Sequence, residues 1–279
     1  MVLISLNQNC TKDLSLLTFI KTFKKFRFVE LDHQKIDDYL FEGGNLTDLL
    51  DLLEMYNTKP LGIFGLKDIT LCSEREFKTK ALRTFEKMMD YCYRVHCNYI
   101  MMTPSKMAID DLKAIPKWRR INKTIERLKF IIKHAYDQDI AIGLEFSSDS
   151  GSSIEQLEEL IEIFRQLEDK ENFSCIIDAF HLKKADINIS DLNNELVERI
   201  GLIQLSDTKE IRQNFKGGEK ELKRAIPTET GCSFELISFF QRIFYKKPFS
   251  LEFPINLEIT RLKDLSKNIF SVFKKARTF

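Results

Sequence analysis

The sequence lacks the features of a membrane protein, a nucleic-acid binder and a disulfide-rich secreted protein. No apolar run approaches the roughly 20 residues that a membrane-spanning helix needs. The 43 Lys and Arg residues nearly balance the 42 Asp and Glu residues, so no net field would draw the chain to nucleic acid or to an anionic membrane. None of the six cysteines forms a C-x-x-C pair, which indicates reduced thiols. Because residues 1–6 also lack the basic leader of a signal peptide, we expect a cytoplasmic protein.

The sequence also lacks the glycine-rich loops that hold nucleotide phosphates. It contains no G-x-G-x-x-G, no Walker-type loop and no G-x-S-x-G nucleophile turn. Residues 7–11, which follow the first predicted strand, contain no glycine. An open doubly wound sheet would carry a phosphate turn after an early strand, so that architecture is only the second choice.

What the sequence has is a regular alternation of short apolar runs and segments with helical spacing. The apolar runs predict eight strands, at residues 2–6, 26–31, 61–66, 98–103, 140–146, 174–178, 202–207 and 249–253. Such alternation is typical of a parallel sheet with right-handed crossovers. No linker-like or low-complexity segment divides the chain. We therefore predict one α/β domain over residues 1–279, closed into a (β/α)8 TIM barrel.

The last four predicted strands each carry one oxygen-bearing side chain where the apolar run ends: Glu145, Asp178, Gln204 and Glu252. In a barrel, the C-terminal ends of all strands converge on one mouth. Three carboxylates meeting there without a cation would repel one another and take up protons. We therefore predict that these four residues bind a divalent metal, with Mn²⁺ or Mg²⁺ preferred over Zn²⁺ or Co²⁺ because every ligand is an oxygen.

A simpler interpretation competes with the metal site. A carboxylate at a strand end often only caps the next helix or pairs with a lysine. For a single residue the two interpretations are equally good. The recurrence on four consecutive strands is what favours the metal.

These motifs resemble the xylose isomerase-like TIM barrels, the sugar phosphate isomerase/epimerase superfamily, over essentially the whole chain. Residues 142–145 resemble the fifth-strand metal glutamate of that family, and residues 178–181 are similar to its D-x-x-H motif. Residues 204–207 match its seventh-strand motif, usually H-x-x-D, and residues 250–253 resemble its eighth-strand glutamate. Residues 28–31 are similar to its second strand.

The resemblance implies a metal-dependent isomerase or epimerase acting on a sugar, a sugar phosphate or a small hydroxy-ketone. Glu145 and Glu252 would move a proton to and from the carbon beside a carbonyl, through an enediolate. Asp178 and Gln204 would serve as metal ligands only, and His181 would hydrogen-bond a substrate oxygen. Gln204 departs from the usual His, although the hydroxypyruvate isomerases of the superfamily carry Gln there. The departure fits either a metal site made harder by an amide oxygen or a member that has lost its metal.

Two further residues are candidates for substrate binding, and a homodimer or homotetramer is compatible with the sequence. Arg212, in a predicted polar loop after the seventh strand, could pair with a phosphate or carboxylate, although a solvated arginine is the favoured interpretation. Trp118, the only tryptophan, could line the sugar pocket or pack against the barrel.

Other functions remain open at this stage. A dehydratase of the inositol or dehydroshikimate type would share the first proton abstraction, and a small-ligand-binding barrel would need no chemistry. An abasic-site endonuclease like endonuclease IV would need several histidines from the strand ends. The chain has four His in all, so this function is disfavoured.

Overall fold

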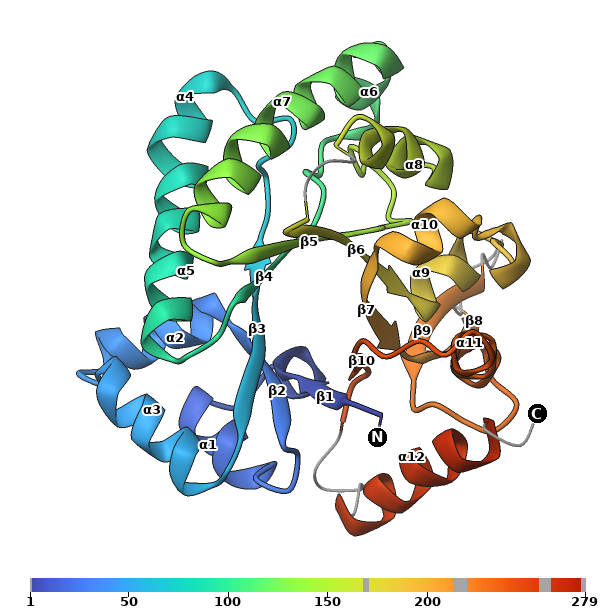
Figure 1. The fold of residues 1–279 in the computed structure, drawn as a ribbon. Coiled ribbons are helices and arrows are strands. Elements are labelled where there is room, and N and C mark those ends of the chain that lie inside the picture. The colour runs from blue at the N-terminus through green and yellow to red at the C-terminus, as the bar shows by residue number, and fades with distance from the viewer. Residues whose placement is uncertain (1, 168–170, 213–219, 256–261, 277–279) are drawn as a thin grey trace.

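Eight parallel strands form a closed barrel in the computed structural model of the chain, which describes residues 2–167, 171–212, 220–255 and 262–276 (Figure 1). Around the barrel the order is β1-β10-β7-β6-β5-β4-β3-β2. The strands are β1 (Ile4–Asn7), β2 (Phe28–Asp32), β3 (Lys59–Leu66), β4 (Tyr99–Met102), β5 (Ala141–Glu145), β6 (Phe173–Asp178), β7 (Ile200–Leu205) and β10 (Phe249–Leu251). The closed barrel confirms the predicted fold and excludes the open sheet.

Helices form a ring outside the strands (Figure 1). They are α1 (Leu16–Thr22), α2 (His33–Phe41), α3 (Leu46–Met55), α4 (Glu74–Glu76), α5 (Leu82–Arg94), α6 (Ile109–Lys113), α7 (Lys117–Tyr136), α8 (Leu157–Arg165), α9 (Ala179–Lys184), α10 (Asn194–Arg199), α11 (Cys232–Arg242) and α12 (Leu262–Ala276). Short helical turns η1 (Gln8–Thr11), η2 (Phe77–Ala81) and η3 (Ile189–Asp191) complete the described elements.

Helix starts follow the capping residues in the sequence. Asn45 caps α3 by accepting a hydrogen bond from the backbone N–H of Asp48, as predicted. Ser73 and Glu76 form a reciprocal capping box at α4. A π-helical turn, η2, separates α4 from α5.

Apolar side chains fill two separate spaces. The larger cluster packs the strands against the surrounding helices. The smaller one draws Phe64, Met101, Ile176 and Leu202 from four different strands and lies inside the barrel. Gly143 makes room there for the Tyr99 ring, because an added Cβ would lie 2.1 Å from the tyrosine oxygen. The middle of the barrel is therefore packed, and open space remains at its ends.

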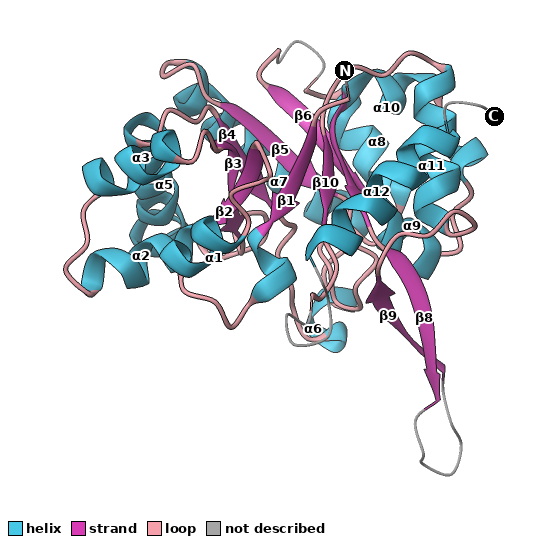
Figure 2. Cartoon of the chain, turned by 90° about the horizontal axis from the view of Figure 1, so that it is seen from below, coloured by secondary structure: helices cyan, strands magenta, loops and turns pink. Residues whose placement is uncertain are grey.

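The sequence predicts a polar loop over residues 208–221, and this prediction is wrong for the described residues 208–212 and 220–221. Strands β8 (Asp207–Arg212) and β9 (Lys220–Ala225) pair as an antiparallel hairpin. Figure 2 shows the hairpin projecting from the barrel at the end opposite to the N-terminus. Because polar side chains can occupy both faces of a projecting hairpin, the strands lack the apolar run by which buried strands are recognised.

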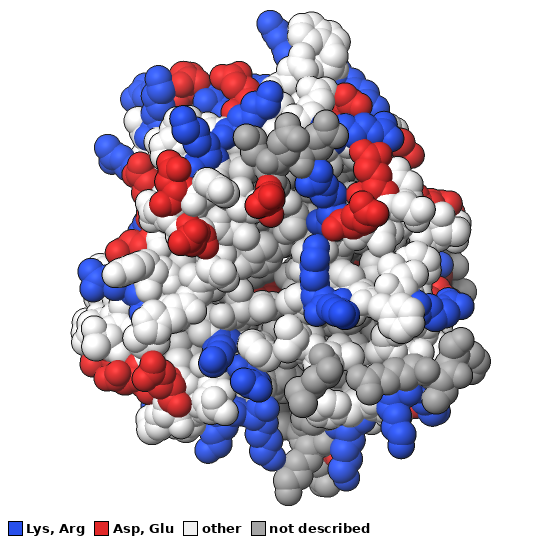
Figure 3. Space-filling view, viewed as in Figure 1, with Lys and Arg blue, Asp and Glu red and all other residues white. Residues whose placement is uncertain are grey.

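Charge and hydropathy in the structure agree with the composition. Figure 3 shows the same face of the molecule as Figure 1, and basic and acidic side chains are interspersed over much of it. Within the described ranges, no helix is both long enough and apolar enough to cross a membrane.

Candidate functional site

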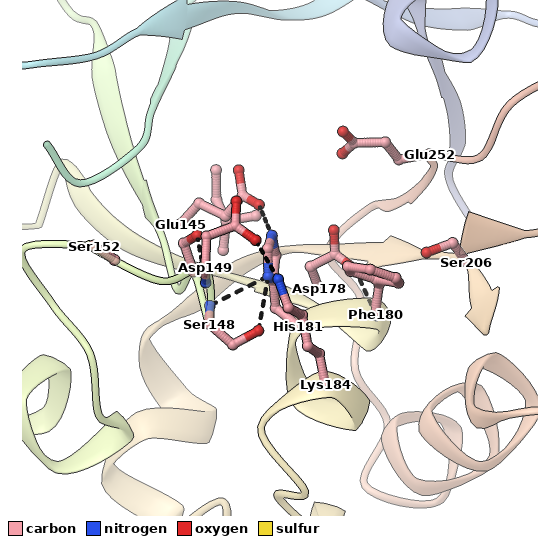
Figure 4. Close-up of polar contacts among 12 residues, drawn as sticks. Glu145, Ser148, Asp149, Ser152, Asp178, Phe180, His181, Lys184, Ser206 and Glu252 are labelled. Atoms are coloured by element: carbon pink, nitrogen blue, oxygen red, sulfur yellow. Dashed lines mark hydrogen bonds and ion pairs between the residues drawn. The ribbon is translucent and has the colours of Figure 1, made fainter. Parts of the chain in front are cut away.

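The ends of the barrel strands surround a cavity of about 570 Å³. Its lining includes Glu145, His181, Gln204 and Glu252, four of the residues expected from the sequence. Asp178 is completely buried behind them, at the end of β6. Figure 4 shows Glu145, Asp178 and His181 gathered on one side, with Glu252 facing them from the other. The strand ends therefore converge around shared space that is not filled by packed hydrocarbon.

His181 is a neutral hydrogen-bond donor in this site. Burial lowers its pKa below the ordinary histidine value. Nδ1 accepts a hydrogen bond from the backbone N–H of Ser148 at 3.2 Å, so the ring proton belongs on Nε2. Nε2 lies 3.5 Å from Glu145 Oε1. We expected His181 to contact a substrate oxygen, and the structure directs its N–H toward Glu145.

Asp178 combines the two interpretations offered for a strand-end carboxylate. Its Oδ1 accepts a hydrogen bond from the backbone N–H of Phe180 at 2.7 Å and so caps α9. Its Oδ2 lies 2.6 Å from Arg224 Nη1 in an ion pair. One oxygen therefore serves the helix, and the other faces the charged residues of the mouth.

Arg224 is the functional candidate that the sequence prediction missed. It lies on β9 and donates hydrogen bonds to Ser206 Oγ at 3.0 Å and to the backbone oxygen of Glu252 at 3.3 Å. Its guanidinium also stands 4.7 Å from the centre of the Phe180 ring. Because β9 pairs with β8 and returns to the barrel, the guanidinium of Arg224 lies in the mouth.

Two oxygens of the site are buried without a hydrogen-bond partner: Gln204 Oε1 and Glu252 Oε2. Gln204 is the neighbour of Asp178 on β6 and of Ser250 on β10, so the register places it between the two acidic strands. Buried polar atoms in native proteins are nearly always paired. These two oxygens are therefore acceptors that the described residues leave available to a bound ligand.

The two glutamates are held partly uncharged by their surroundings. Burial raises the pKa of Glu145 well above its ordinary value, and the charges of Glu252 and Asp178 raise it further. Burial likewise raises the pKa of Glu252 to about 7, although Arg224 opposes the shift. Burial is thus the largest cause of the raised pKa of both carboxyls.

The charges of the site fit one divalent cation. When ionised, Glu145, Asp178 and Glu252 carry three negative charges, and Arg224 supplies one positive charge. Two negative charges then remain without a counterion. Oxygens of Glu145 and Asp178 and a ring nitrogen of His181 lie within 4.8 Å of one another, the one such group found among the described residues. Glu252 is outside this group, across the cavity.

Asp149 lies in the same cavity but has its own counterions. Lys184 Nζ is 2.7 Å from its Oδ1, and Lys106 forms a second ion pair with its Oδ2. Burial alone would raise the pKa of Asp149, but the two lysines hold it below its ordinary range. Asp149 therefore lines the cavity as an ion-paired carboxylate and is not a candidate base.

Of the other two predicted substrate-binding residues, Trp118 is not brought to the cavity. Trp118 is 64% exposed on the first turn of α7 and is absent from the cavity lining. Arg212 ends β8, where the hairpin has left the barrel, and its side chain lies outside the described part of the chain. For Trp118 the reason is that α7 begins at Lys117, earlier than expected, and turns the indole outward.

Comparisons with known proteins agree with the architecture. The sequence model of the family described as xylose isomerase-like TIM barrel matches residues 20–269. An inosose isomerase from Halalkalibacterium halodurans is 22% identical over 181 residues, which are 65% of this chain and 62% of that protein, so the match spans less than two thirds of the relative. The solved structure of the IOLI protein with a bound zinc atom has a TM-score of 0.83 at 19% identity, covering 98% of both chains.

A further solved structure, D-psicose 3-epimerase with D-tagatose from Clostridium cellulolyticum H10, has a TM-score of 0.74 at 13% identity. It covers 99% of this chain and 98% of the epimerase. At such identities the structural likeness establishes the fold alone.

Proposed function

Because the chain belongs to the xylose isomerase-like TIM barrel family, we propose that it isomerises or epimerises a small sugar or hydroxy-ketone. Glu145 and Glu252 would move a proton at the carbon beside a carbonyl, with a divalent metal bound at the mouth. The names of two similar proteins, an inosose isomerase and a psicose epimerase, support this reaction class.

One observation carries the proposal. Glu145 and Glu252 face each other across a cavity, and burial raises the pKa of both carboxyls, that of Glu252 to about 7. A carboxylate with an ordinary pKa is a weak base, and general acid–base catalysis is most efficient when the pKa lies near the working pH. Two such groups on opposite sides of a substrate can remove a proton on one side and return one on the other.

Each of the two carboxyls has its own polar neighbours. His181 Nε2 lies 3.5 Å from Glu145 Oε1, beside that carboxyl. Asn9 Nδ2 lies 3.4 Å from Glu252 Oε1 and holds the second one. Arg224 remains charged beside Asp178 and offers guanidinium N–H groups to negative charge developing on a substrate oxygen.

The residues present fit a divalent metal. Glu145, Asp178, Gln204 and Glu252 would hold it, because they provide the orphan oxygens and the unbalanced charge described above. When bound, such a cation supplies the positive charge that polarises a carbonyl oxygen. An oxygen-only donor set favours Mn²⁺ or Mg²⁺, whereas the similar IOLI protein was solved with zinc. Metal analysis of the purified protein decides between them.

Exchange of substrate hydrogen with solvent tests the reaction class. We expect wild-type protein, incubated in D₂O with Mn²⁺ and a panel of ketoses, aldoses and inososes, to place deuterium beside the carbonyl of one compound. Glu145→Gln should abolish the exchange, whereas Glu159→Gln, a buried glutamate paired with Arg120 outside the cavity, should retain it.

Two results would change the assignment. Exchange that survives in Glu145→Gln would refute the proposed pair of glutamates. A product that has lost water, detected by its mass, would identify a dehydratase that begins with the same proton abstraction.

A further inference from the structure

A second buried carboxylate lies inside the barrel, below the cavity, and the mechanism above does not use it. Glu30, on β2, is completely buried. The Ser5 hydroxyl donates to its Oε1, and Asn7 Nδ2 donates to its Oε2 at 2.8 Å. Burial raises the pKa of Glu30, and the donors of Ser250, Ser5 and Asn7 oppose that shift.

A carboxyl at this position is unfavourable for stability alone. Transfer of an ionisable group into the interior costs several kcal/mol unless its partners compensate, and a well-packed apolar side chain of similar volume is often neutral or stabilising instead. The hydrogen bonds of Glu30 therefore need to be followed for a functional role.

Those contacts lead to Glu252 in three steps. Glu30 Oε2 accepts from Asn7 Nδ2, which leaves Asn7 Oδ1 free to accept from the backbone N–H of Asn9 at 2.8 Å. Asn9 Nδ2 in turn lies 3.4 Å from Glu252 Oε1. Asn7 and Asn9 both line the cavity, so the chain of hydrogen bonds rises from the packed interior to the reacting groups.

The carboxylate of Glu30 determines which way the Asn7 amide faces. Both oxygens of Glu30 accept hydrogen bonds, from Ser5 and from Asn7, so the carboxyl faces the NH₂ end of the Asn7 amide and the amide oxygen turns toward η1. That oxygen caps η1, the turn that carries Asn9. The turn is also anchored from both sides, because Gln8 Oε1 accepts from the N–H of Asp32 and the N–H of Ile255 donates to the backbone oxygen of Cys10.

We propose that Glu30 is a positioning residue, which orients the Glu252 carboxyl through Asn7 and Asn9 so that its free oxygen faces the metal and the substrate. The inference rests on the proposed function in that it takes Glu252 as a metal ligand. Residues that hold a ligating carboxylate by hydrogen bonds typically matter almost as much as the ligand itself.

Metal affinity tests this role separately from turnover. Mn²⁺ alone is the probe, and free Mn²⁺ is measured by electron paramagnetic resonance during a titration of each purified variant. Asn9→Ala should weaken Mn²⁺ binding about tenfold, the lower end of the loss expected when such a partner is removed. Asn172→Ala is the matched control, because its Nδ2 bonds the backbone oxygens of Ile132 and Ile140 outside the cavity. It should bind as the wild type does.

Two substitutions of Glu30 distinguish positioning from a structural role. Glu30→Met removes the acceptor and should weaken Mn²⁺ binding about as much as Asn9→Ala. It should also lower the melting temperature of the metal-free protein, because the donors of Ser5 and Asn7 are left buried without an acceptor. Glu30→Gln can still accept from Asn7, and should restore most of the affinity. The double variant Glu30→Met/Asn9→Ala should bind Mn²⁺ no more weakly than the single variant with the larger loss of affinity, because both changes break the same chain of contacts.

The outcomes separate the two proposals. If the wild type binds Mn²⁺ and both Asn9→Ala and Glu30→Met bind it equally well, the positioning role is refuted and the proposed function stands. The role is also refuted if Glu30→Met lowers stability but not affinity. A wild type that binds no Mn²⁺ refutes the metal site and, with it, the positioning of a ligand.

Discussion

The two halves of the barrel mouth use similar side chains in different ways. In the first half, two strand-end residues serve the fold: Asp32 Oδ1 caps α2 by accepting from the N–H of Gln34, and Asn7 caps η1. In the second half, Gln204 and Glu252 leave buried oxygens without partners. An oxygen at a strand end is therefore informative only once its hydrogen-bond partners are known.

The difference extends to charge. In the second half three carboxylates share one arginine, and their protonation must make up for the missing positive charge. The lone carboxylate of Asp32 faces no comparable crowding, because it stands at 3.7 Å from the His33 ring and bonds a backbone N–H. Chemistry is therefore expected where the fold leaves charge unbalanced, and structural support where the fold has satisfied it.

The largest expected effect comes from exchanging one carboxyl in each half. Glu252→Gln keeps the shape of the side chain but removes the base, and should lower kcat about a thousandfold, within the range usual for a general base. Asp32→Asn keeps an oxygen for the α2 cap and should lower kcat less than tenfold. Steady-state kinetics on the substrate found by deuterium exchange measures both. Equal losses in the two variants would show that the halves do not differ in this way.

Metal binding should stabilise the protein through the second half only. Mn²⁺ at about 100 times its Kd should raise the free energy of unfolding by about 2.7 kcal/mol, since it binds only the folded state. Gln204→Leu removes the orphan Oε1 and should reduce this gain. Thermal melts with Mn²⁺ and with EDTA provide the measurement. Identical melting temperatures in the two conditions would argue that the wild type holds no metal.

The pH dependence of stability should reveal Glu252 in the metal-free protein. Its pKa is raised to about 7 in the folded state, so between its ordinary value and pH 7 the native state binds more protons than the unfolded state. Stability from this group is full at low pH and is lost as the pH rises through that window. As the pH rises, we expect the free energy of unfolding of the wild type to fall on the order of 1–2 kcal/mol relative to that of Glu252→Gln.

Urea unfolding between pH 4.5 and 8 measures this difference. Glu252→Gln cannot titrate, so subtracting its curve isolates Glu252 from the other carboxyls. A wild type that gained stability relative to the variant across this range would have a lowered pKa at Glu252, contrary to the structure. Saturating Mn²⁺ should flatten the difference, because the cation favours the ionised carboxylate in the folded state.

The sequence was sufficient for the barrel and for the strand-end residues because both follow from periodicity. Alternation of apolar runs and helices fixes the topology, and topology then brings Glu145, Asp178, Gln204 and Glu252 to one mouth. Pair distances do not follow from periodicity. The structure adds that Glu145, Asp178 and His181 form one close group and that Glu252 faces this group across the cavity.

Arg224 and Glu30 escaped the sequence for different reasons. Arg224 reaches Asp178 only because a hairpin forms where a loop was expected, and its strands carry no apolar alternation that would reveal it. Glu30 lies in a strand that resembles the family's second strand, but nothing in the local sequence distinguishes a carboxyl that faces the barrel interior from one that faces solvent. Both residues are defined by partners distant in sequence, such as Ser250 for Glu30.

Trp118 gives the smallest expected effect, and it tests the outer boundary of the site. Its side chain is 64% exposed on the first turn of α7, although an aromatic wall for a sugar was one interpretation of the sequence. Trp118→Ala should leave kcat/KM within about twofold and stability within about 0.5 kcal/mol, as is usual for surface substitutions. Because Trp118 is the only tryptophan, its fluorescence should report a solvated indole and should not change when Mn²⁺ or substrate binds. A blue shift or quenching on addition of substrate would mean that the substrate site extends from the strand ends to Trp118 on α7.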